Sequence, residues 1–273
     1  PADQGVSFIE MYAHSTKLSS IALVLAKLNF QVIPGLLDYA YHTALTVNEK
    51  LCLIFCFEQR LDARGADFLI NCLRDGHREV RKQAASALAA LPTAKALPDL
   101  LHLLFDQESS VRVALLTAIN SLHLPVDLTP LMVCLEDKNP LVRRKALQLI
   151  IQQQDERVTD ALLFALQDDR WGIVNDAVKA LRLKGDGIAV ALIDKLSAKG
   201  RYCKVAAVTL LGEFKCVEAV PMLNVLLKNS GCKKLRKQIA IALGNIGDAQ
   251  GVSALCGALD DRVLDVRYAV LTA

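Results

Sequence analysis

The feature that most constrains the fold of this chain is a nine-residue pattern that recurs along nearly its whole length. Residues 80–88, Val-Arg-Lys-Gln-Ala-Ala-Ser-Ala-Leu, show the pattern most clearly. It restarts every 29 to 33 residues, most often after 31, at Val111, Val142, Ile173, Tyr202, Leu235 and Val266, with weaker copies at Glu49 and Leu18. A fixed period of this length predicts a repeat array in which each unit buries its apolar face against its neighbours.

Each period predicts two helices joined by a short polar turn. Residues 96–105 form one first helix, with Pro98 in the first turn, where a missing N–H costs nothing. Residues 111–122 form the second helix, because their apolar residues recur at spacings of three and four. The other first helices are expected at 66–74, 128–136, 158–167, 188–198, 219–228 and 251–259. Leu, Ala, Val and Ile carry the burial, since the chain is 53% hydrophobic but only 5% aromatic. We therefore expect an all-α fold of about eight two-helix repeats.

Two charged positions recur together with the apolar ones. An aspartate precedes the pattern start by five residues in most repeats, and an arginine follows the first apolar residue. An acidic residue in the turn favours the start of the second helix, and an arginine can reach an aspartate of its own or the next repeat. Stacking then predicts a structural ladder made by Asp75, Arg81, Asp106, Arg112, Asp137, Arg143, Asp168, Arg236, Asp261 and Arg267.

These residues give the chain a resemblance to HEAT-like repeats, in particular the short variety of the phycobilin-lyase-type family. The resemblance is carried by the Asp-x4-Val-Arg signature and the Ala-Ala-x-Ala-Leu body within residues 75–88, and by residues 241–248. It implies a right-handed α–α superhelix. Residues 66–273 match the regular repeat, whereas residues 1–65 are expected to be divergent capping repeats of the same solenoid. The marks of tetratricopeptide and ankyrin units are absent.

The ladder is predicted to be interrupted between residues 174 and 235. Val174 replaces the arginine after Ile173, and Cys203 replaces it after Tyr202. Serines replace the aspartates of the next two turns, Ser197 and Ser230. A softer joint or a local change of curvature is expected to follow.

Positive charge gathers in the same region. Residues 179–237 carry thirteen basic and four acidic side chains, a net charge of +9, whereas residues 1–178 sum to −4 and residues 238–273 to −2. In HEAT-type stacks the second helices line the concave side, so part of this basic set could face a groove. Such a segment attracts an acidic protein, a nucleic-acid backbone or an anionic membrane surface, or it is simply a solvated face. The candidate partner-binding residues are Arg144, Lys204, Lys233, Lys234 and Lys237.

Trp171, the only tryptophan, is the remaining candidate contact residue. It follows three charged residues in an expected turn. A tryptophan in such a place either anchors a partner or covers the end of the neighbouring repeat. Only Tyr202 and Phe214 are aromatic within the basic segment, so stacking platforms for nucleic acid are few.

No catalytic, cofactor or metal-binding motif is found. The chain has no HExxH, P-loop, GxGxxG or Cys/His zinc spacing. None of its five histidines begins a His-Glu pair, so the iron-binding pairs of deoxyhypusine hydroxylase, an enzyme built from similar repeats, have no counterpart. The eight cysteines include no CxxC pair and fall mostly in apolar positions, as expected of buried thiols in a reducing compartment.

Three functional hypotheses follow for what is expected to be a cytoplasmic protein without cofactors. The first is a non-enzymatic scaffold or adaptor that holds another protein on its concave surface, with an acidic protein as the partner that the basic segment suits. The second is a phycobilin-lyase-like chromophore lyase or chaperone, which only the resemblance implies. The third is nucleic-acid binding through a basic groove. The chain lacks an initial Met and stops inside an expected helix, which predicts a piece of a longer protein.

Overall fold

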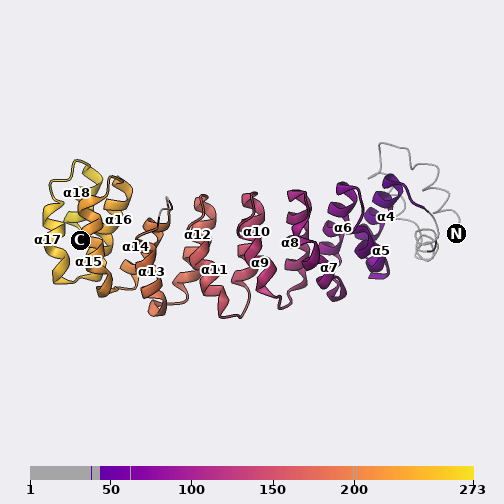
Figure 1. The fold of residues 1–273 in the computed structure, drawn as a ribbon, viewed down its shortest axis with the longest axis horizontal. Coiled ribbons are helices and arrows are strands. Elements are labelled where there is room, and N and C mark those ends of the chain that lie inside the picture. The colour runs from indigo at the N-terminus through magenta and orange to yellow at the C-terminus, as the bar shows by residue number, and fades with distance from the viewer. Residues whose placement is uncertain (1–37, 39–43, 62, 199, 201) are drawn as a thin grey trace. The chain divides into compact units, whose positions relative to one another are not determined.

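The computed structural model describes residue 38 and residues 44–273, apart from residues 62, 199 and 201. Its chain divides into two compact units, Pro1–Leu149 and Ile150–Ala273. The expected capping repeats before residue 44 lie outside the described residues, with the exception of residue 38. Within the described residues all regular structure is helical, which agrees with the all-α prediction (Figure 1).

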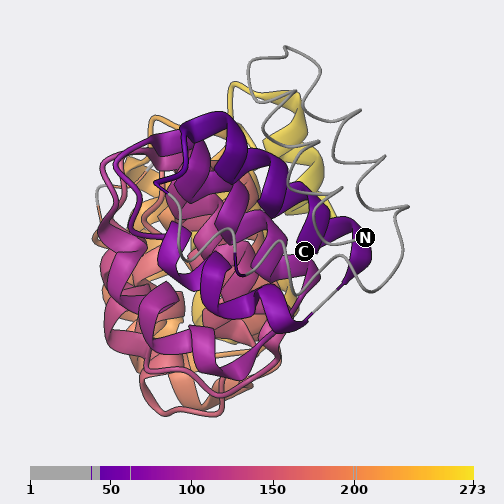
Figure 2. The ribbon, with the colours of Figure 1, turned by 90° about the vertical axis from the view of Figure 1, so that its right-hand side faces the viewer.

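The first unit contains the second helix of one repeat and three further two-helix repeats. Their α-helices are α4 (Val47–Arg60), α5 (Ala66–Cys72), α6 (Arg78–Ala90), α7 (Leu97–His102), α8 (Ser109–Leu122), α9 (Leu128–Cys134) and α10 (Pro140–Ile151), the last of which runs two residues past the unit boundary. The second helices α4, α6 and α8 pack in sequence, and α5 and α7 pack on the second helices of their own repeats. Figure 2 looks along this stack and shows successive repeats of the unit one behind another.

The second unit contains four two-helix repeats. Their α-helices are α11 (Arg157–Ala165), α12 (Trp171–Arg182), α13 (Ala189–Lys195), α14 (Cys203–Glu213), α15 (Val220–Asn229), α16 (Lys233–Ile246), α17 (Val252–Gly257) and α18 (Leu264–Leu271). The second helices α12, α14, α16 and α18 pack in sequence. Several first helices begin or end in a single turn of 3₁₀ helix: Ala63–Gly65, Ala94–Ala96, Leu103–Phe105, Asp186–Ile188, Val217–Ala219 and Ala249–Gly251.

The nine-residue pattern explains why these helices stack. In α6 the pattern residues Val80, Ala84, Ala85, Ala87 and Leu88 are all buried. The small alanines let neighbouring second helices approach, and the valine and leucine fill the space between the two helices of a repeat. The polar members of the pattern stay at the surface of the same helix. One sequence period therefore builds one layer of the core.

The weak copy that Glu49 opens is a full member of this stack. Thr46 caps α4 by accepting a hydrogen bond from the Glu49 N–H, and the Glu49 carboxylate accepts one from the Thr46 N–H at 2.6 Å. This reciprocal pair satisfies two donors that a helix start leaves unpaired. Glu49 itself is buried, and α4 packs on α6. The boundary expected at residue 66 therefore does not interrupt the packing.

One copy of the pattern starts a residue later than the sequence predicts. Cys203, rather than Tyr202, is fully buried like Val80, and Tyr202 is the N-cap of α14. The backbones of Gly212 and Gly244 make equivalent close approaches, to Ala242 and Ala273, which sets the two helices in the same register. The copy therefore starts at Cys203. Lys204 then holds the position that arginine holds elsewhere, and the assignment of Cys203 to that position is wrong.

The error has a physical cause. Tyrosine is partly apolar, so Tyr202 fits the first position of the pattern about as well as Cys203 does, and only burial separates them. Trp171 is also displaced from its expected place: it begins α12 and does not lie in the preceding turn.

Candidate protein-binding surface

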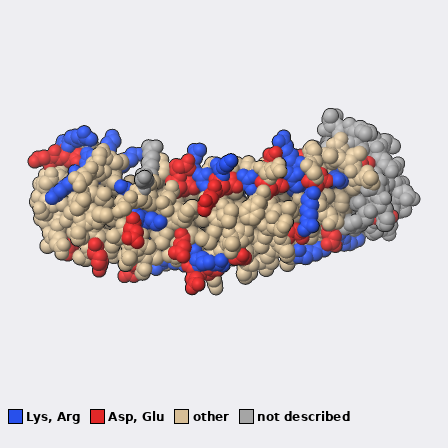
Figure 3. All heavy atoms as spheres, viewed as in Figure 1, with Lys and Arg blue, Asp and Glu red and all other residues tan. Residues whose placement is uncertain are grey.

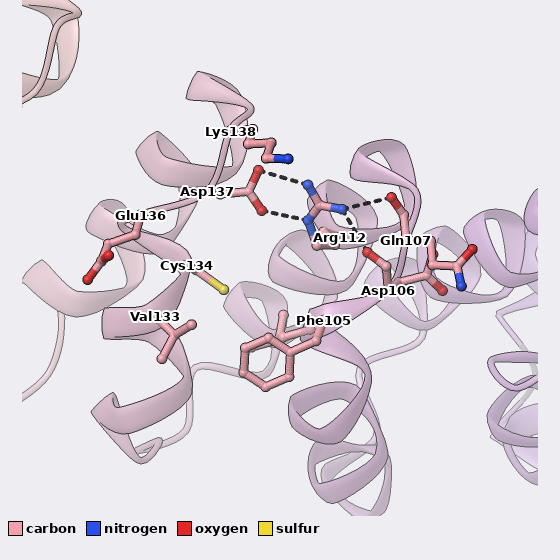
Figure 4. Close-up of a pocket in the computed structure, with 10 residues that line it drawn as sticks. Phe105, Asp106, Gln107, Arg112, Val133, Cys134, Glu136, Asp137 and Lys138 are labelled. Carbon is pink, nitrogen blue, oxygen red and sulfur yellow. Dashed lines mark hydrogen bonds and ion pairs between the residues drawn. The ribbon is translucent and has the colours of Figure 1, made fainter.

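The ladder residues form bidentate ion pairs between consecutive repeats. The Arg112 guanidinium donates from Nε to Asp137 Oδ2 at 2.6 Å and from Nη2 to Asp137 Oδ1 at 2.8 Å (Figure 4). Arg81 binds Asp106 in the same way, and Arg236 binds Asp261. Lys50 makes the first link of the series with a single bond of 2.6 Å to Asp75. In all four pairs the partners are 25 residues apart, so each pair joins one repeat to the next.

The same side chains also fix the turn inside each repeat. Arg112 donates from Nη1 to the carbonyl oxygen of Asp106 at 2.7 Å, six residues earlier in the chain. The Asp137 carboxylate accepts a hydrogen bond from the backbone N–H of Asn139 at 2.7 Å. One arginine and one aspartate thus stabilise two turns and the contact between two consecutive repeats. The ladder therefore has a structural role.

The pKa values of the ladder carboxyls follow from these bonds. Burial by itself would raise the pKa of Asp137, but hydrogen bonds from Arg112 and from the Asn139 N–H more than offset it, and the pKa is lowered. For Asp261 the hydrogen bond from Arg236 is the largest influence and lowers the pKa. The carboxylates therefore stay ionised and paired, which suits a structural ladder better than proton transfer.

Arg143, Asp168 and Arg267 hold the turns of their own repeats. Arg143 donates to the carbonyl oxygen of Asp137 at 2.9 Å, and Arg267 donates to that of Asp261 at 2.7 Å. Asp168 accepts from the N–H of Arg170 at 2.8 Å. A link between Arg143 and Asp168 would join the two units, and it remains a prediction.

The second unit replaces the missing ladder links with other contacts. Arg182 at the end of α12 pairs bidentately with Glu213 at the end of α14, at 2.7 and 2.8 Å, but both side chains are substantially exposed. The rings of Trp171 and Tyr202 meet with their centroids 5.4 Å apart and their planes tilted by 59°. Trp171 therefore covers part of the next repeat, one of its two predicted roles, while 47% of its surface stays exposed.

The predicted partner-binding lysines all lie at the N-terminal ends of α14 and α16. Lys204 is in the first turn of α14 and is partly exposed. Lys233 and Lys234 begin α16 and are exposed, and exposed Lys237 lies one turn later, with its ammonium 3.5 Å from Asp265. We call these four lysines the basic edge. Since α14 and α16 pack side by side, the fold gathers residues that the sequence places 29 to 33 positions apart.

Arg144 is not one of the residues of the basic edge. It is an exposed residue of α10 in the first unit, whereas the basic edge belongs to the second. Its membership in a shared binding surface remains a prediction.

Two shallow depressions recur at equivalent places in the two units. The first, of about 440 Å³, has Phe105 and Val133 on its apolar side and the Arg112–Asp137 pair on its polar side (Figure 4). The second, of about 450 Å³, lies beside the Arg236–Asp261 pair. Phe105 and Val133 are 59% and 52% exposed. Because both depressions adjoin ladder pairs, they follow from the repeat geometry.

The first unit carries ion pairs both along its ladder and outside it, such as Arg74–Asp99 and Lys95–Asp67. Figure 3 shows acidic and basic side chains interleaved over the upper ends of α6 and α8, and further charged side chains of both signs below α6. The first unit therefore balances its charges locally, and the basic edge of the second unit differs from this arrangement.

The described residues include no arrangement typical of a metal or redox centre. No group of three or more His, Cys, Asp or Glu side chains among them is placed to hold a metal ion. Burial raises the pKa of the Cys72 thiol to about 12 and those of Cys52 and Cys134 to about 11. These thiols are therefore poor nucleophiles at neutral pH. None of the described helices is long and apolar enough to cross a lipid bilayer.

Stacked pairs of short helices with a repeating ladder define a helical-repeat solenoid. The family model for HEAT repeats matches residues 66–138 and 188–273, more than half of the chain. The chain belongs to the HEAT-repeat family. A search of curated proteins found no match.

Three solved structures align with most of this chain. A chain from the complex of Kap95p with RanGDP aligns with 97% of this chain at a TM-score of 0.57 and 11% identity, and the alignment spans 42% of that longer chain. YibA of Escherichia coli is 17% identical over 94% of this chain and 97% of its own length, with a TM-score of 0.49. Human deoxyhypusine hydroxylase is 21% identical over 96% of each chain, with a TM-score of 0.37.

Proposed function

We propose that this chain is a non-enzymatic scaffold that binds another protein, and that the partner is acidic where it contacts the basic segment 179–237. The single observation that carries the proposal is the basic edge, where Lys204, Lys233, Lys234 and Lys237 gather at the start of α14 and α16. Protein surfaces rich in one sign of charge favour partners of the opposite sign and speed their association.

The repeat architecture supports binding rather than catalysis. Solenoids present long surfaces built from successive repeats, and the ladder residues of this one hold the repeats together. The complex of Kap95p with RanGDP shows that a repeat chain of similar fold can take part in a protein assembly. The free thiols of all eight cysteines are consistent with a protein of the reducing cytoplasm, which we include in the proposal.

A pull-down from native cell extract tests the proposal. The wild-type chain is compared with a variant in which Lys233, Lys234 and Lys237 are all changed to Glu, each with and without nuclease treatment. We expect the wild type to retain a stoichiometric protein partner at moderate salt, and the variant to lose it, because reversed charges repel an acidic surface.

Circular dichroism provides the control, since all three lysines are exposed and the helical content should not change. Retention that disappears on nuclease treatment would favour nucleic acid as the partner. If the wild type and the triple variant retain the partner equally, the three lysines serve solubility and not partner binding.

A further inference from the structure

One ladder link of the second unit lacks its carboxylate. Lys204 holds the basic position of its repeat, and the residue that corresponds to Asp106, Asp137 and Asp261 in the following turn is Ser230. Ser230 keeps the role of the aspartate within the turn: its hydroxyl accepts from the Cys232 N–H at 3.2 Å, and its carbonyl oxygen accepts from Arg236 at 3.0 Å. It cannot reach back to the preceding repeat, because the hydroxymethyl side chain is shorter and uncharged.

Three of the positive charges around this position form no ion pair within the described residues, whereas Arg236 and Lys237 pair with Asp261 and Asp265. No acidic side chain among the described residues lies within 4.0 Å of the ammonium groups of Lys204, Lys233 or Lys234. The first turns of α14 and α16 contain no acidic residue. Cations at a helix N-terminus also oppose the helix dipole, so this arrangement costs stability. By contrast, α6 carries Glu79 in its first turn, where it accepts from Lys82 and Gln83.

We infer that a carboxylate of a partner protein occupies the empty ladder position between Lys204 and Ser230, and that the partner segment is an acidic peptide. The inference rests on the proposed scaffold function and names the chemistry of its partner. The charge of the basic edge complements such a segment, and Lys233 and Lys234 would receive its further acidic side chains.

A carboxylate is favoured over a phosphate because the ladder itself shows what the position accepts. In four other repeats the equivalent basic side chain binds a carboxylate, at 2.6 Å for the shortest bond of each pair. The partner would restore the contact that the rest of the ladder makes within the chain.

The Trp171–Tyr202 pair lies at the same end of the second helices. Trp171 begins α12, Tyr202 caps α14, and Lys204 follows two residues later. The exposed part of the Trp171 ring gives an apolar side chain of the segment a place to pack next to its acidic one. The expected ligand is therefore a peptide that combines Glu or Asp with interspersed apolar residues.

The test supplies the missing carboxylate in cis. Ser230→Asp should restore the ladder link to Lys204 and close the site, whereas Asn245→Asp adds the same charge at an exposed position near the other end of α16. The probe is a fluorescein-labelled peptide of repeated Glu-Glu-Leu units, and its binding to the full chain is followed by fluorescence anisotropy at low ionic strength.

We expect Ser230→Asp to weaken peptide binding about fivefold to tenfold, because it both occupies the position and repels the ligand. Asn245→Asp should change the affinity by less than about twofold, since exposed charges away from the contact contribute little. A second variant, Lys204→Gln, should weaken binding by a similar factor without adding negative charge, which keeps the test valid if Ser230→Asp does not fold.

Three outcomes would overturn the inference: equal weakening by the two Asp substitutions, no binding of the peptide by the wild type, or tighter binding of a single-stranded oligothymidylate that Ser230→Asp leaves unchanged. The last outcome would identify the basic edge as a nucleic-acid surface. If a protein captured in the pull-down is retained equally by Ser230→Asp and by the wild type, the scaffold function stands and only this inference fails.

Discussion

Four ladder aspartates bond both to their own turn and to the preceding repeat, so a single residue stabilises two levels of structure: Asp75, Asp106, Asp137 and Asp261. Asp137 accepts from the Asn139 N–H within its turn and from both Nε and Nη2 of Arg112 across the junction. The side chains of this pair are only 14% and 11% exposed. Hydrogen bonds between charged groups that are shielded from water contribute more than exposed ion pairs do.

Replacing Arg112 should therefore destabilise the first unit. In Arg112→Met the apolar stem is kept and the charge is lost, which leaves the Asp137 carboxylate and the Asp106 carbonyl oxygen without their guanidinium donor. We expect a loss of about 2 kcal/mol or more in the free energy of unfolding, measured by urea denaturation.

Arg182→Met is the matched control for Arg112→Met. It removes the Arg182–Glu213 pair, whose side chains are 46% and 34% exposed, so the loss should be about 0.5 kcal/mol or less. Equal losses in the two variants would show that burial does not set the strength of these pairs.

Neighbouring second helices approach closely where a glycine of one lies against an alanine, as Gly212 does against Ala242. A Cβ atom added at Gly212 of α14 would lie 2.7 Å from both Cα and Cβ of Ala242 in α16. Backbone atoms cannot yield to that extent without separating the helices. The glycine is therefore required by packing, and its low intrinsic helix propensity is tolerated for this reason.

Gly212→Ala should consequently weaken the junction between α14 and α16. Overpacking of a close helix contact costs about 1–3 kcal/mol. The replacement of Gly by Ala in a helix gains about 1 kcal/mol in helix propensity, which is less than the upper part of that cost. We expect a net loss in thermal stability, measured by circular dichroism.

Gly257→Ala in α17 serves as the comparison, since an added Cβ would meet nothing within 4 Å there. That variant should be neutral or more stable than the wild type. A Gly212→Ala protein that is at least as stable as the wild type would contradict the packing argument.

At the scale of the whole chain, the regular spacing of the pattern predicts the architecture. It does not predict the ion pairs of residues that depart from the pattern. The repeated pattern placed the second helices and identified the residues of the Arg81, Arg112 and Arg236 pairs, but it left open whether each arginine binds an aspartate of its own repeat or of the next. It missed the role of Lys50, where lysine replaces arginine. It also missed the Arg182–Glu213 pair, since neither residue occupies a recurring charged position and only the packed helices bring them together.

The candidate binding residues were predictable as a charged segment but not as a surface. The net charge of residues 179–237 is visible in the sequence, yet its distribution depends on which helix ends meet. In the predicted register Lys204 is a candidate groove-facing side chain. Because the repeat starts one residue later, at Cys203, Lys204 instead holds the ladder position of arginine, and it has no carboxylate partner there. Burial decides that register, and burial depends on the neighbouring helix.

The uneven ladder predicts uneven local stability along the chain. Residues 80–150 contain the shielded Arg81–Asp106 and Arg112–Asp137 pairs, whereas residues 174–235 rely on the exposed Arg182–Glu213 pair and have Val174 and Lys204 in the arginine positions. Local opening requires less free energy where fewer shielded contacts must break. We therefore expect amides of residues 174–235 to exchange with deuterium about tenfold faster than those of residues 80–150, because one lost link is worth about 1.5 kcal/mol.

Hydrogen–deuterium exchange, measured by mass spectrometry on peptides from both regions, gives the comparison. The variant Ser230→Asp should slow exchange in α14 and α16 by completing a link. Uniform protection across both regions would mean that apolar packing, and not the ladder, sets the local stability of this solenoid.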